Sequence, residues 1–535
     1  MDKNYSVIAL PQLLFYVYFT VMLCAKGIGL VDGTMPFKVA LVVSSLCVLI
    51  KIAIEKHTII EYLFITLLLG LGLLIWQISG NQSAIVMFFL IVSLKDVSER
   101  SAFKYASIIW SAAFFFQILT HLLNIRNQDF VIHNKYGLGY IIRWALGYSH
   151  PNVLQIAYAV LIAYILFSML FRGKQLIRFI IISCIGAIFF FLFSISLTGI
   201  IMYFLLIMFY VVFVARLQIG RTIGSVEKVI LNIILPCAVL SSIVLPLILQ
   251  GEAFDFVNKV MQTRPSLTKY FLTTYNLTLF GLNYEGLFYT YNLDSSYPNL
   301  LVNSGIIAFC FFMTVYILMI RKTINDYSDK KDIYYAAKLA IIFSFCIAGI
   351  SEPFFFNISY KNVTLIFLAQ YVWDNIKKVR GKEYQILKIS RAFDISYYKN
   401  RLESICNYFN DFGNHVSQQK SIFVIIIAFS VGMGTVLGNI VYNEPNSVYA
   451  LRKSCDTEDD TQSIFLSEEE ANALREDSNV WFLNYEDENA HMLRFDGNIT
   501  KIDKYRTIIT FSIGFLLFIL MINLISYNVS MRKNK

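Results

Sequence analysis

The sequence predicts an all-α polytopic membrane protein with about 14 transmembrane helices and with both termini in the cytoplasm. Of its 535 residues 57% are hydrophobic and only 15% are charged, whereas soluble proteins carry about 25% charged residues. The mean hydropathy is +0.59. Long apolar runs alternate with short polar links, and basic residues gather in every second link. The first run, residues 7–24, has no small-residue cleavage site after it and is expected to remain as the first helix.

The apolar runs define the predicted helices in chain order. A helix that crosses the membrane needs about 20 mainly apolar residues. The second and fourth runs are shorter than this, and the break between the seventh and eighth rests on "SISLTG" alone. The predicted spans are residues 7–25, 37–54, 58–78, 82–94, 104–123, 153–171, 178–195, 198–215, 229–249, 299–320, 336–350, 362–376, 421–441 and 506–527.

The basic residues predict the orientation of these spans. Lysine and arginine are enriched in cytoplasmic links of membrane proteins. With the N-terminus inside, every basic cluster falls on the cytoplasmic side, including the tail at residues 532–535. The clusters within the chain are Lys51/Lys56, Lys95/Arg100/Lys104, Arg172/Lys174/Arg178, Arg216/Arg221/Lys228, Arg321/Lys322/Lys330/Lys331 and Lys377/Lys378/Arg380/Lys382.

The same orientation predicts the domain organisation. Residues 1–378 form a twelve-helix core with long external loops at 124–152 and 250–298. Residues 379–420 form a cytoplasmic link, in which "RAFDISYYKNRLESICNYFNDF" is interpreted as an amphipathic helix or as an ordinary soluble link. Residues 421–535 add two helices around an external loop, 442–505. That loop contains fifteen acidic against six basic residues, which predicts a solvated outer segment.

Several function classes are excluded or disfavoured. No Walker A, GxSxG or HExxH pattern is present, and the six histidines are scattered without ligand spacing. We therefore expect no metal and no cofactor. The cysteines have no paired spacing, and the basic residues follow the topology rather than forming a nucleic-acid patch. The apolar runs contain almost no charged residues, which counts against an ion-coupled transporter.

Candidate functional residues lie in the predicted external segments of the core. The stretch "YIIRWALGYSHPN", residues 140–152, ends the first long loop, the second loop holds Arg264 and Lys269, and "GISEPFFFNISYKN" forms a short third link. Arginine presents a planar fork of donors that matches phosphate or carboxylate. Two such forks from separate loops would hold one diphosphate at the membrane surface. The candidates are Arg143, His150, Asn152, Arg264, Lys269, Asp294, Tyr297 and Glu352.

Four of these stretches together resemble the Wzy-type polymerases of capsule, exopolysaccharide and O-antigen repeat units, within the O-antigen ligase/polymerase-like membrane proteins. "RWALGYSHPN" is similar to the family's Arg-led element ending in His-Pro-Asn, and "TRPSLTKYFLTTYNLTLFG" to its Arg-led external helix. "LDSSYPNLLVNSGIIAF" and "SEPFFFN" resemble two later elements. The resemblance covers residues 1–378. The chain departs from it at Asp294-Ser295, where related ligases often have His-Asn, and at Pro298, where leucine is usual.

The resemblance implies an enzyme of the bacterial cytoplasmic membrane whose active site faces outside. Such a polymerase transfers a growing glycan from polyprenyl diphosphate onto a new lipid-linked repeat unit, without metal or nucleotide sugar. Arg143 and Arg264 would stabilise the leaving diphosphate, and Asp294, Glu352 or His150 would accept the proton. Asn152, Lys269 and Tyr297 would join His150 in binding substrate. The expected partners are the lipid-linked oligosaccharide, membrane lipid, and a flippase and chain-length regulator of the same pathway. No nucleic acid is expected.

Other interpretations stay open. A lipid-linked oligosaccharide flippase or polysaccharide exporter would have a similar number of helices. A ligase-like enzyme would share the fold. A chain-length regulator is also considered, but such a protein would not need the twelve-helix core. In another interpretation, the side chains of Arg143 and Arg264 extend to lipid headgroups and do not bind substrate. His150 and Asp294 are suited to capping helices, and Glu352 to pairing structurally with an arginine.

Overall fold

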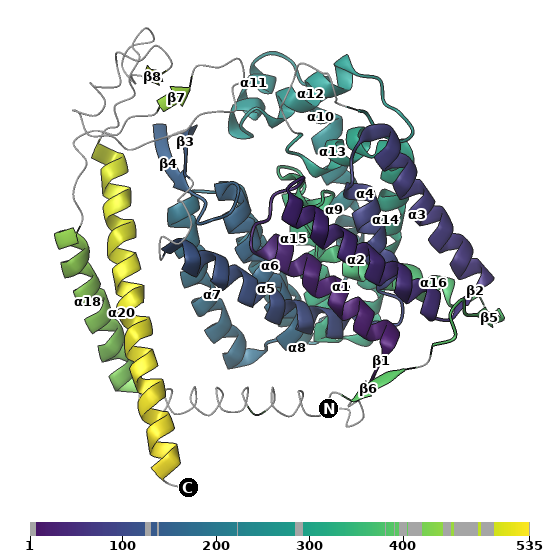
Figure 1. Ribbon diagram of the computed structural model, residues 1–535. Coiled ribbons are helices and arrows are strands. Elements are labelled where there is room, and N and C mark those ends of the chain that lie inside the picture. Colours follow the sequence, from purple (N-terminus) through teal and green to yellow (C-terminus); the bar gives the residue numbers. More distant parts are fainter. Residues whose placement is uncertain are drawn as a thin grey trace. The chain divides into compact units, whose positions relative to one another are not determined.

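The computed structural model is mainly helical (Figure 1). It describes residues 7–122, 130–135, 139–221, 223–283, 293–379, 381–389, 391–394, 404, 420–441, 451–453, 480–482 and 497–533. The chain forms two compact units. The core unit comprises Ala9–Asp129 and Ala145–Ala392, and the hairpin unit comprises Met1–Ile8, Phe130–Trp144 and Phe393–Lys535. The predicted boundaries at 378 and 420 therefore differ from this division, and the functional separation of the two parts stays a prediction.

The helices of the core unit follow the apolar runs. They are α1 (Leu10–Gly27), α2 (Met35–Ile54), α3 (Ile59–Ser79), α4 (Ser83–Ser93), α5 (Glu99–Leu122), α6 (Pro151–Met169), α7 (Gly173–Ser194), α8 (Leu197–Gln218), α9 (Ser225–Ile243), α10 (Leu245–Ile248), α11 (Gly251–Val260), α12 (Arg264–Thr274), α13 (Ser296–Asn303), α14 (Gly305–Lys330), α15 (Ile333–Ala348) and α16 (Thr364–Ile376). A 3-10 turn, η1 (Pro353–Phe355), and two short strands, β2 (His57–Thr58) and β5 (Glu383–Tyr384), complete this unit.

The helices have the properties of membrane spans. Among the described residues ten helices are long and apolar enough to cross a membrane, and three shorter apolar helices accompany them. Each of the fourteen predicted ranges overlaps a helix, which confirms a polytopic helical membrane protein. The number of crossings and the orientation stay predictions.

Two predicted spans are interrupted. The range 299–320 was expected to be one helix, but α13 ends at Asn303 and α14 begins at Gly305. Gly305 has φ +83° and lies against the backbone of Leu279 and Gly281, where a side chain would collide. The range 229–249 divides into α9 and α10 at Val244. Apolar runs indicate which residues avoid water, and they do not reveal such breaks.

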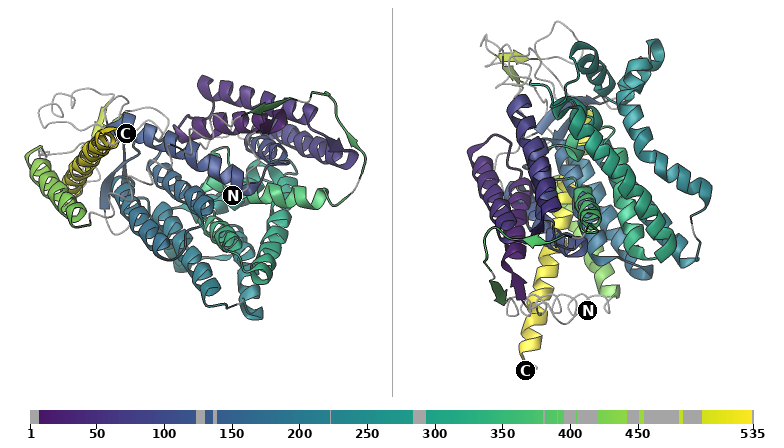
Figure 2. Two further views of the ribbon diagram at one scale, coloured as in Figure 1. Left: turned by 90° about the horizontal axis from the view of Figure 1, so that it is seen from below. Right: turned by 90° about the vertical axis from the view of Figure 1, so that its right-hand side faces the viewer.

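The centre of the core unit is made by helices that are buried on most sides. Helices α6 and α15 are buried over most of their length, and α8 packs against both of them. Buried tryptophans tie neighbouring helices together. Trp110 Nε1 donates to the Ala157 carbonyl over 3.0 Å, and Trp373 Nε1 donates to the Ile91 carbonyl over 2.8 Å. Figure 2 shows the helices of this unit packed in a bundle.

Two lysines lie within predicted spans and are buried. Lys51 in α2 donates to Glu55 over 2.7 Å, and Lys338 in α15 donates to Glu99 over 2.6 Å. A buried charge is tolerated in a low-dielectric interior when an opposite charge and hydrogen bonds compensate it. Glu61 of α3, another buried charge within a predicted span, is likewise paired, with Lys95.

Within the described residues, the hairpin unit is built on two long helices and several short strands. Helix α18 (Lys420–Val441) packs against α20 (Gly497–Lys533). Strand β3 (Phe130–Lys135) pairs antiparallel with β4 (Gly139–Trp144), and β7 (Leu451–Lys453) with β8 (Val480–Phe482). Strands β1 (Val7–Ala9) and β6 (Ala392–Asp394) lie at the unit boundaries. The amphipathic helix predicted from Arg391 is wrong at its start, where β6 is extended. Most of its remainder, and most of loop 442–505, lies outside the described residues.

Small residues allow α18 to approach α20 closely. A β-carbon added at Gly438 would lie 2.7 Å from Ile508 Cγ1, and one at Gly434 would collide with Ser512. The spacing of these glycines, four residues apart, is typical of helices that associate in membranes.

We expect Gly438→Val to weaken this helix pair by about 1–3 kcal/mol, because the added side chain overpacks the contact with Ile508. Amide hydrogen exchange of α18 and α20 in detergent measures the effect. Gly432→Val is the matched control, since a β-carbon there meets nothing within 4 Å. Equal exchange in the two variants would contradict the close packing.

Candidate functional site

A buried carboxylate lies where the predicted external elements of the core unit meet. Glu352 follows α15, directly before η1, and its side chain is 6% exposed. Its Oε1 accepts a hydrogen bond from Asn152 Nδ2 over 3.1 Å and from Arg264 Nη2 over 3.3 Å. The Thr198 hydroxyl donates to the same oxygen. We call Asn152, Thr198, Arg264, Asp294 and Glu352 the Glu352 cluster.

Four helices begin at this cluster. Asn152 and Thr198 each lie in the first turn of their helices, α6 and α8, and Arg264 is the first residue of α12. Ser296, the first residue of α13, donates through its hydroxyl to the backbone carbonyl of Glu352. Helix N-termini carry partial positive charge and unpaired N–H groups. The position of Glu352 is therefore suited to negative charge.

The His-Pro-Asn stretch has a clear local role in starting α6. His150 is the N-cap, and its Nδ1 accepts a hydrogen bond from the backbone N–H of Asn152 over 3.2 Å. Pro151 occupies the first helical position, which suits a residue without an N–H. The cap directs the Asn152 side chain to Glu352. The capping interpretation of His150 is thus confirmed, and a further role in substrate binding stays a prediction.

Arg264 is held between two carboxylates. Its Nη1 donates to the Met261 carbonyl over 3.2 Å, and its Nη2 lies 3.8 Å from Asp294 Oδ2 in addition to its bond with Glu352. The side chain is only 7% exposed, so it does not extend to lipid headgroups. Its Nε is buried and has no hydrogen-bond partner among the described residues. A buried polar group without a partner is uncommon in folded proteins.

Asp294 differs from Glu352 in its surroundings. It lies two residues before α13, whose N-cap is Ser295, so Asp294 does not cap the helix as one interpretation had it. The Asp294 side chain is 46% exposed to solvent. Desolvation by the surrounding protein raises the pKa of Asp294, and the nearby Arg264 charge only partly offsets this rise. Asp294 is thus an accessible carboxylate beside a buried cation.

The residues after Asp294 serve packing. Ser296 donates its backbone N–H to the Gly349 carbonyl over 2.9 Å, and the Tyr297 hydroxyl donates to the Cys346 carbonyl over 2.6 Å. Both acceptors lie at the C-terminal end of α15. Tyr297 is fully buried. These contacts join α13 to α15 and account for Tyr297 without substrate, so we do not propose the sugar-binding role expected from the sequence.

Lys269 is directed away from the Glu352 cluster. Five residues along a helix place a side chain about 140° around the axis from the first. The Lys269 ammonium lies 3.5 Å from the Leu249 carbonyl and 4.6 Å from the centre of the Phe254 ring. The structure thus gives Lys269 partners beside α11, and its predicted substrate role is not supported by these contacts.

We expect Lys269→Gln to leave polymer length and amount unchanged, because the side chain contacts Leu249 and Phe254 rather than the Glu352 cluster. Gel analysis of surface glycan in a deletion strain carrying the variant measures this. A loss of long chains would contradict the assignment of Lys269 to packing.

Arg143 belongs to the hairpin unit, near the end of β4, opposite Val131 of β3. Its side chain is buried. The arrangement of the two units relative to one another is not determined. The predicted clamp of one diphosphate by Arg143 and Arg264 therefore stays a prediction.

Two residues near Glu352 were not singled out from the sequence. Thr198 was visible only as part of the polar break "SISLTG", which is confirmed as the gap between α7 and α8. Lys361 lies in the short link after η1 and is 6% exposed. Burial and the neighbouring Lys26 charge lower the pKa of Lys361 to about 8, although Asp32 and Glu352 oppose this. In the sequence, Lys361 stood out only as a cation in a predicted external link.

The chemistry of the cluster is that of charge stabilisation and proton transfer. Among the described residues no group of three His, Cys, Asp or Glu side chains is placed to hold a metal ion. Comparisons with protein-family models, with curated proteins and with solved structures find no match to this chain.

Proposed function

We propose that the protein polymerises polyprenyl-diphosphate-linked oligosaccharide repeat units at the outer face of the bacterial cytoplasmic membrane. The main support is the position of Glu352. Several stretches of the sequence resemble Wzy-type polymerases, and residues from each such stretch within the core unit come together around Glu352. Asn152 and Arg264 each donate a hydrogen bond to Glu352 although the three residues are distant in sequence. Asp294 lies 3.8 Å from the same arginine.

The proposed reaction needs a cation that stabilises the leaving diphosphate and a base that accepts a proton. A hydroxyl oxygen of the acceptor sugar attacks the anomeric carbon of the donor glycan, and the bond from that carbon to the diphosphate oxygen breaks. Polyprenyl diphosphate leaves with the bonding electrons. Arg264, with its unused Nε donor, would stabilise the charge on the leaving group.

Asp294 is the better choice of base. A base must reach the substrate, and the Asp294 side chain is half exposed whereas Glu352 is buried. Oxygen Oε1 of Glu352 already accepts three hydrogen bonds. We therefore assign proton acceptance to Asp294. Glu352 is a positioning residue that orients Arg264 and Asn152.

The pH dependence of the reaction should follow the ionisation of the Asp294 carboxylate. The carboxylate accepts a proton only when it is ionised, and its ionised fraction decreases as pH falls through its pKa. Since the pKa of Asp294 is raised, the activity should decline on the acid side at a higher pH than an ordinary aspartate would give. Asp294→Asn should lower kcat by about 10²–10⁴ and remove this limb.

The pH–rate profile of polymerisation measures this prediction. Asp255→Asn, in the exposed part of α11, is the matched control and should keep the full profile. If Asp294→Asn retained the wild-type profile, another group would have to be the base.

A gene deletion distinguishes the proposed polymerase from a flippase or exporter. A strain without a polymerase exports single repeat units on their lipid or anchor, whereas a strain without a flippase retains them inside the cell. We expect single exported units. Retention inside would contradict polymerisation. If the deletion strain made single units and long chains normally but failed to transfer them to the final acceptor, the protein would be a ligase.

A further inference from the structure

A second polar site lies at the other end of the core unit. An open cavity of about 810 Å³ is lined by the start of α1, the end of α2, the start of α3, the α4–α5 link and the end of α16. Residues 381–389 and Arg391, which we call the strap, form its last wall. We name this space the strap cavity. Pockets for small ligands typically have volumes of about 300–1,000 Å³.

The strap cavity is separated from the Glu352 cluster by the length of a helix. Pro11 of α1 lines the cavity, and Lys26 near the other end of α1 interacts electrostatically with Lys361. Fifteen helical residues span about 22 Å. A ligand of the strap cavity therefore does not share atoms with the proposed reaction.

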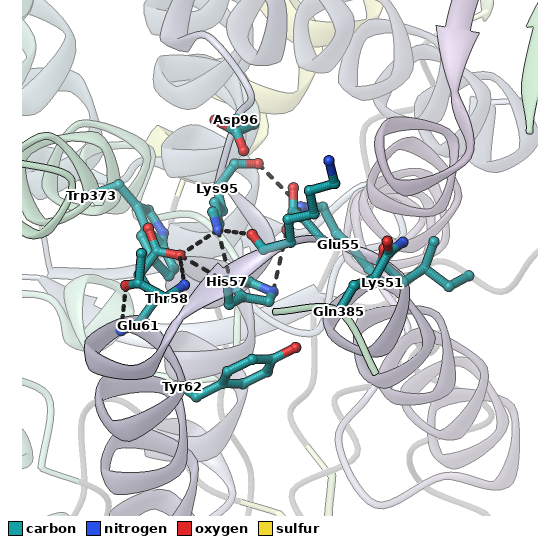
Figure 3. Close-up of polar contacts among 12 residues, drawn as sticks. Lys51, Glu55, His57, Thr58, Glu61, Tyr62, Lys95, Asp96, Trp373 and Gln385 are labelled. Carbon is teal, nitrogen blue, oxygen red and sulfur yellow. Dashed lines mark hydrogen bonds and ion pairs between the residues drawn. The ribbon is translucent and has the colours of Figure 1, made fainter. Parts of the chain in front are cut away.

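The floor of the cavity is a fixed ionic network (Figure 3). Lys95 donates to Glu61 over 2.6 Å and to the backbone carbonyl of Lys56, and Lys51 donates to Glu55 over 2.7 Å. At the rim Lys377 pairs with Asp96. The three carboxylates are thus already compensated by ammonium groups, which leaves no acidic group of the floor free for a cation.

His57 lies behind this floor, next to Lys95, as a neutral ring. Lys95 Nζ lies 3.0 Å from His57 Nδ1, and because an ammonium only donates, Nδ1 accepts and the ring proton is on Nε2. Burial, with repulsion from Lys95 and Lys51, lowers the pKa of His57 to about 3. Nε2 has no hydrogen-bond partner among the described residues. His57 therefore adds no charge to the ionic network behind the cavity wall.

The strap is attached to the core unit by hydrogen bonds. Strand β5 pairs antiparallel with β2, with Thr58 opposite Glu383, and the Leu387 N–H donates to the Ala53 carbonyl over 2.8 Å. The Gln385 side chain donates to the Ile54 carbonyl. The strap residues that line the cavity are Gly381, Glu383, Gln385, Ile389 and Arg391.

The walls contain an excess of unpaired positive charge. Lys56 and Arg391 line the cavity, and neither side chain has a hydrogen bond or ion pair within the described part of the chain. Glu383 is the single lining carboxylate of that part without such a partner. Two free cations against one free carboxylate favour an anion. Arginine and lysine donors match phosphate oxygens.

We propose that the strap cavity binds a small phosphate-bearing ligand, through Lys56 and Arg391, at the end of the core unit opposite the Glu352 cluster. Its source is either a free phosphorylated molecule or the headgroup of an anionic lipid. The site is independent of the polymerisation proposal, because none of its residues belongs to the Glu352 cluster.

Isothermal titration of the purified full-length protein in phosphate-free non-ionic detergent tests the site. The probes are inorganic pyrophosphate and dioctanoyl phosphatidic acid. We expect one probe or both to bind at a 1:1 ratio. Lys56→Gln and Arg391→Gln should each weaken that binding by about 10-fold or more. Pyrophosphate binding indicates a free ligand, and binding of the lipid alone indicates a headgroup.

Lys388→Gln is the matched control, because Lys388 is an exposed strap residue that does not line the cavity and its loss removes the same charge. It should bind the probe like the wild type. The proposal is overturned if neither probe binds at a 1:1 ratio. It is also overturned if Lys388→Gln weakens binding as much as the two wall variants do.

Discussion

Arg264→Ala should reduce polymerisation at least about 100-fold, because it removes the buried cation that we propose stabilises the leaving diphosphate. The same change leaves Glu352 buried without its charged partner, and Asp294 without the cation 3.8 Å away. Removing one partner of a buried ion pair costs about 3–5 kcal/mol of stability. Chain length on gels and thermal unfolding in detergent should therefore both change.

Arg264→Lys separates these two effects. Lysine keeps the charge beside Glu352 but lacks the planar fork and the Nε donor that Arg264 leaves unpaired. We expect folding to recover substantially while the rate per folded molecule stays low. A fully active Arg264→Lys variant would show that the arginine serves stability alone.

Glu352→Ala should have the second largest effect. Three donors, from Asn152, Thr198 and Arg264, would lose their common acceptor. Leaving a buried donor unpaired costs about 1–3 kcal/mol, and more for a charged group. We expect a marked fall in unfolding temperature together with loss of long chains.

Glu352→Gln tests the role of the charge more selectively, since the amide oxygen still accepts hydrogen bonds and the volume is nearly unchanged. A positioning role predicts a folded variant with low kcat and a retained acid limb in its pH profile. Glu227→Gln is a control outside the cluster, because Glu227 pairs with Arg216 and with no residue of the Glu352 cluster. Loss of the acid limb in Glu352→Gln would assign the proton to Glu352 instead of Asp294.

Much of the fold was predictable because a membrane segment must be apolar and satisfy its own backbone. Even short runs such as 82–94 and 336–350 correspond to helices, α4 and α15. Helix ends were less predictable. Helix α14 continues to Lys330, ten residues beyond its apolar run, because polar residues extend a helix that hydropathy no longer marks. The turn at Gly305 depends on contacts with Leu279 and Gly281 that are distant in sequence.

The candidate site was predictable to the extent that its residues stand out in polarity. Asn152, Arg264, Asp294 and Glu352 were all singled out, and they lie together. Thr198 was missed because one hydroxyl in an apolar segment has no distinctive pattern. Lys269 and Tyr297 were selected by type, yet helix geometry turns the first away and buries the second. Which polar groups meet is decided by packing.

The two polar ends of the core unit differ in their chemistry. At the strap cavity each carboxylate of the floor already has its ammonium partner, and the pKa of His57 keeps it neutral. At the Glu352 cluster a buried arginine keeps an unused donor, and a carboxylate with a raised pKa stays half exposed. The first arrangement suits binding, and the second suits charge stabilisation with proton transfer.

Reconstitution tests the central claim most directly. The purified protein in lipid vesicles would be supplied with one polyprenyl-diphosphate-linked repeat unit, and the products would be separated on a gel. The account predicts a ladder of lipid-linked oligomers with release of polyprenyl diphosphate, and no ladder with Arg264→Ala. A folded wild-type protein that leaves the repeat unit unchanged, or an equal ladder with Arg264→Ala, would contradict it.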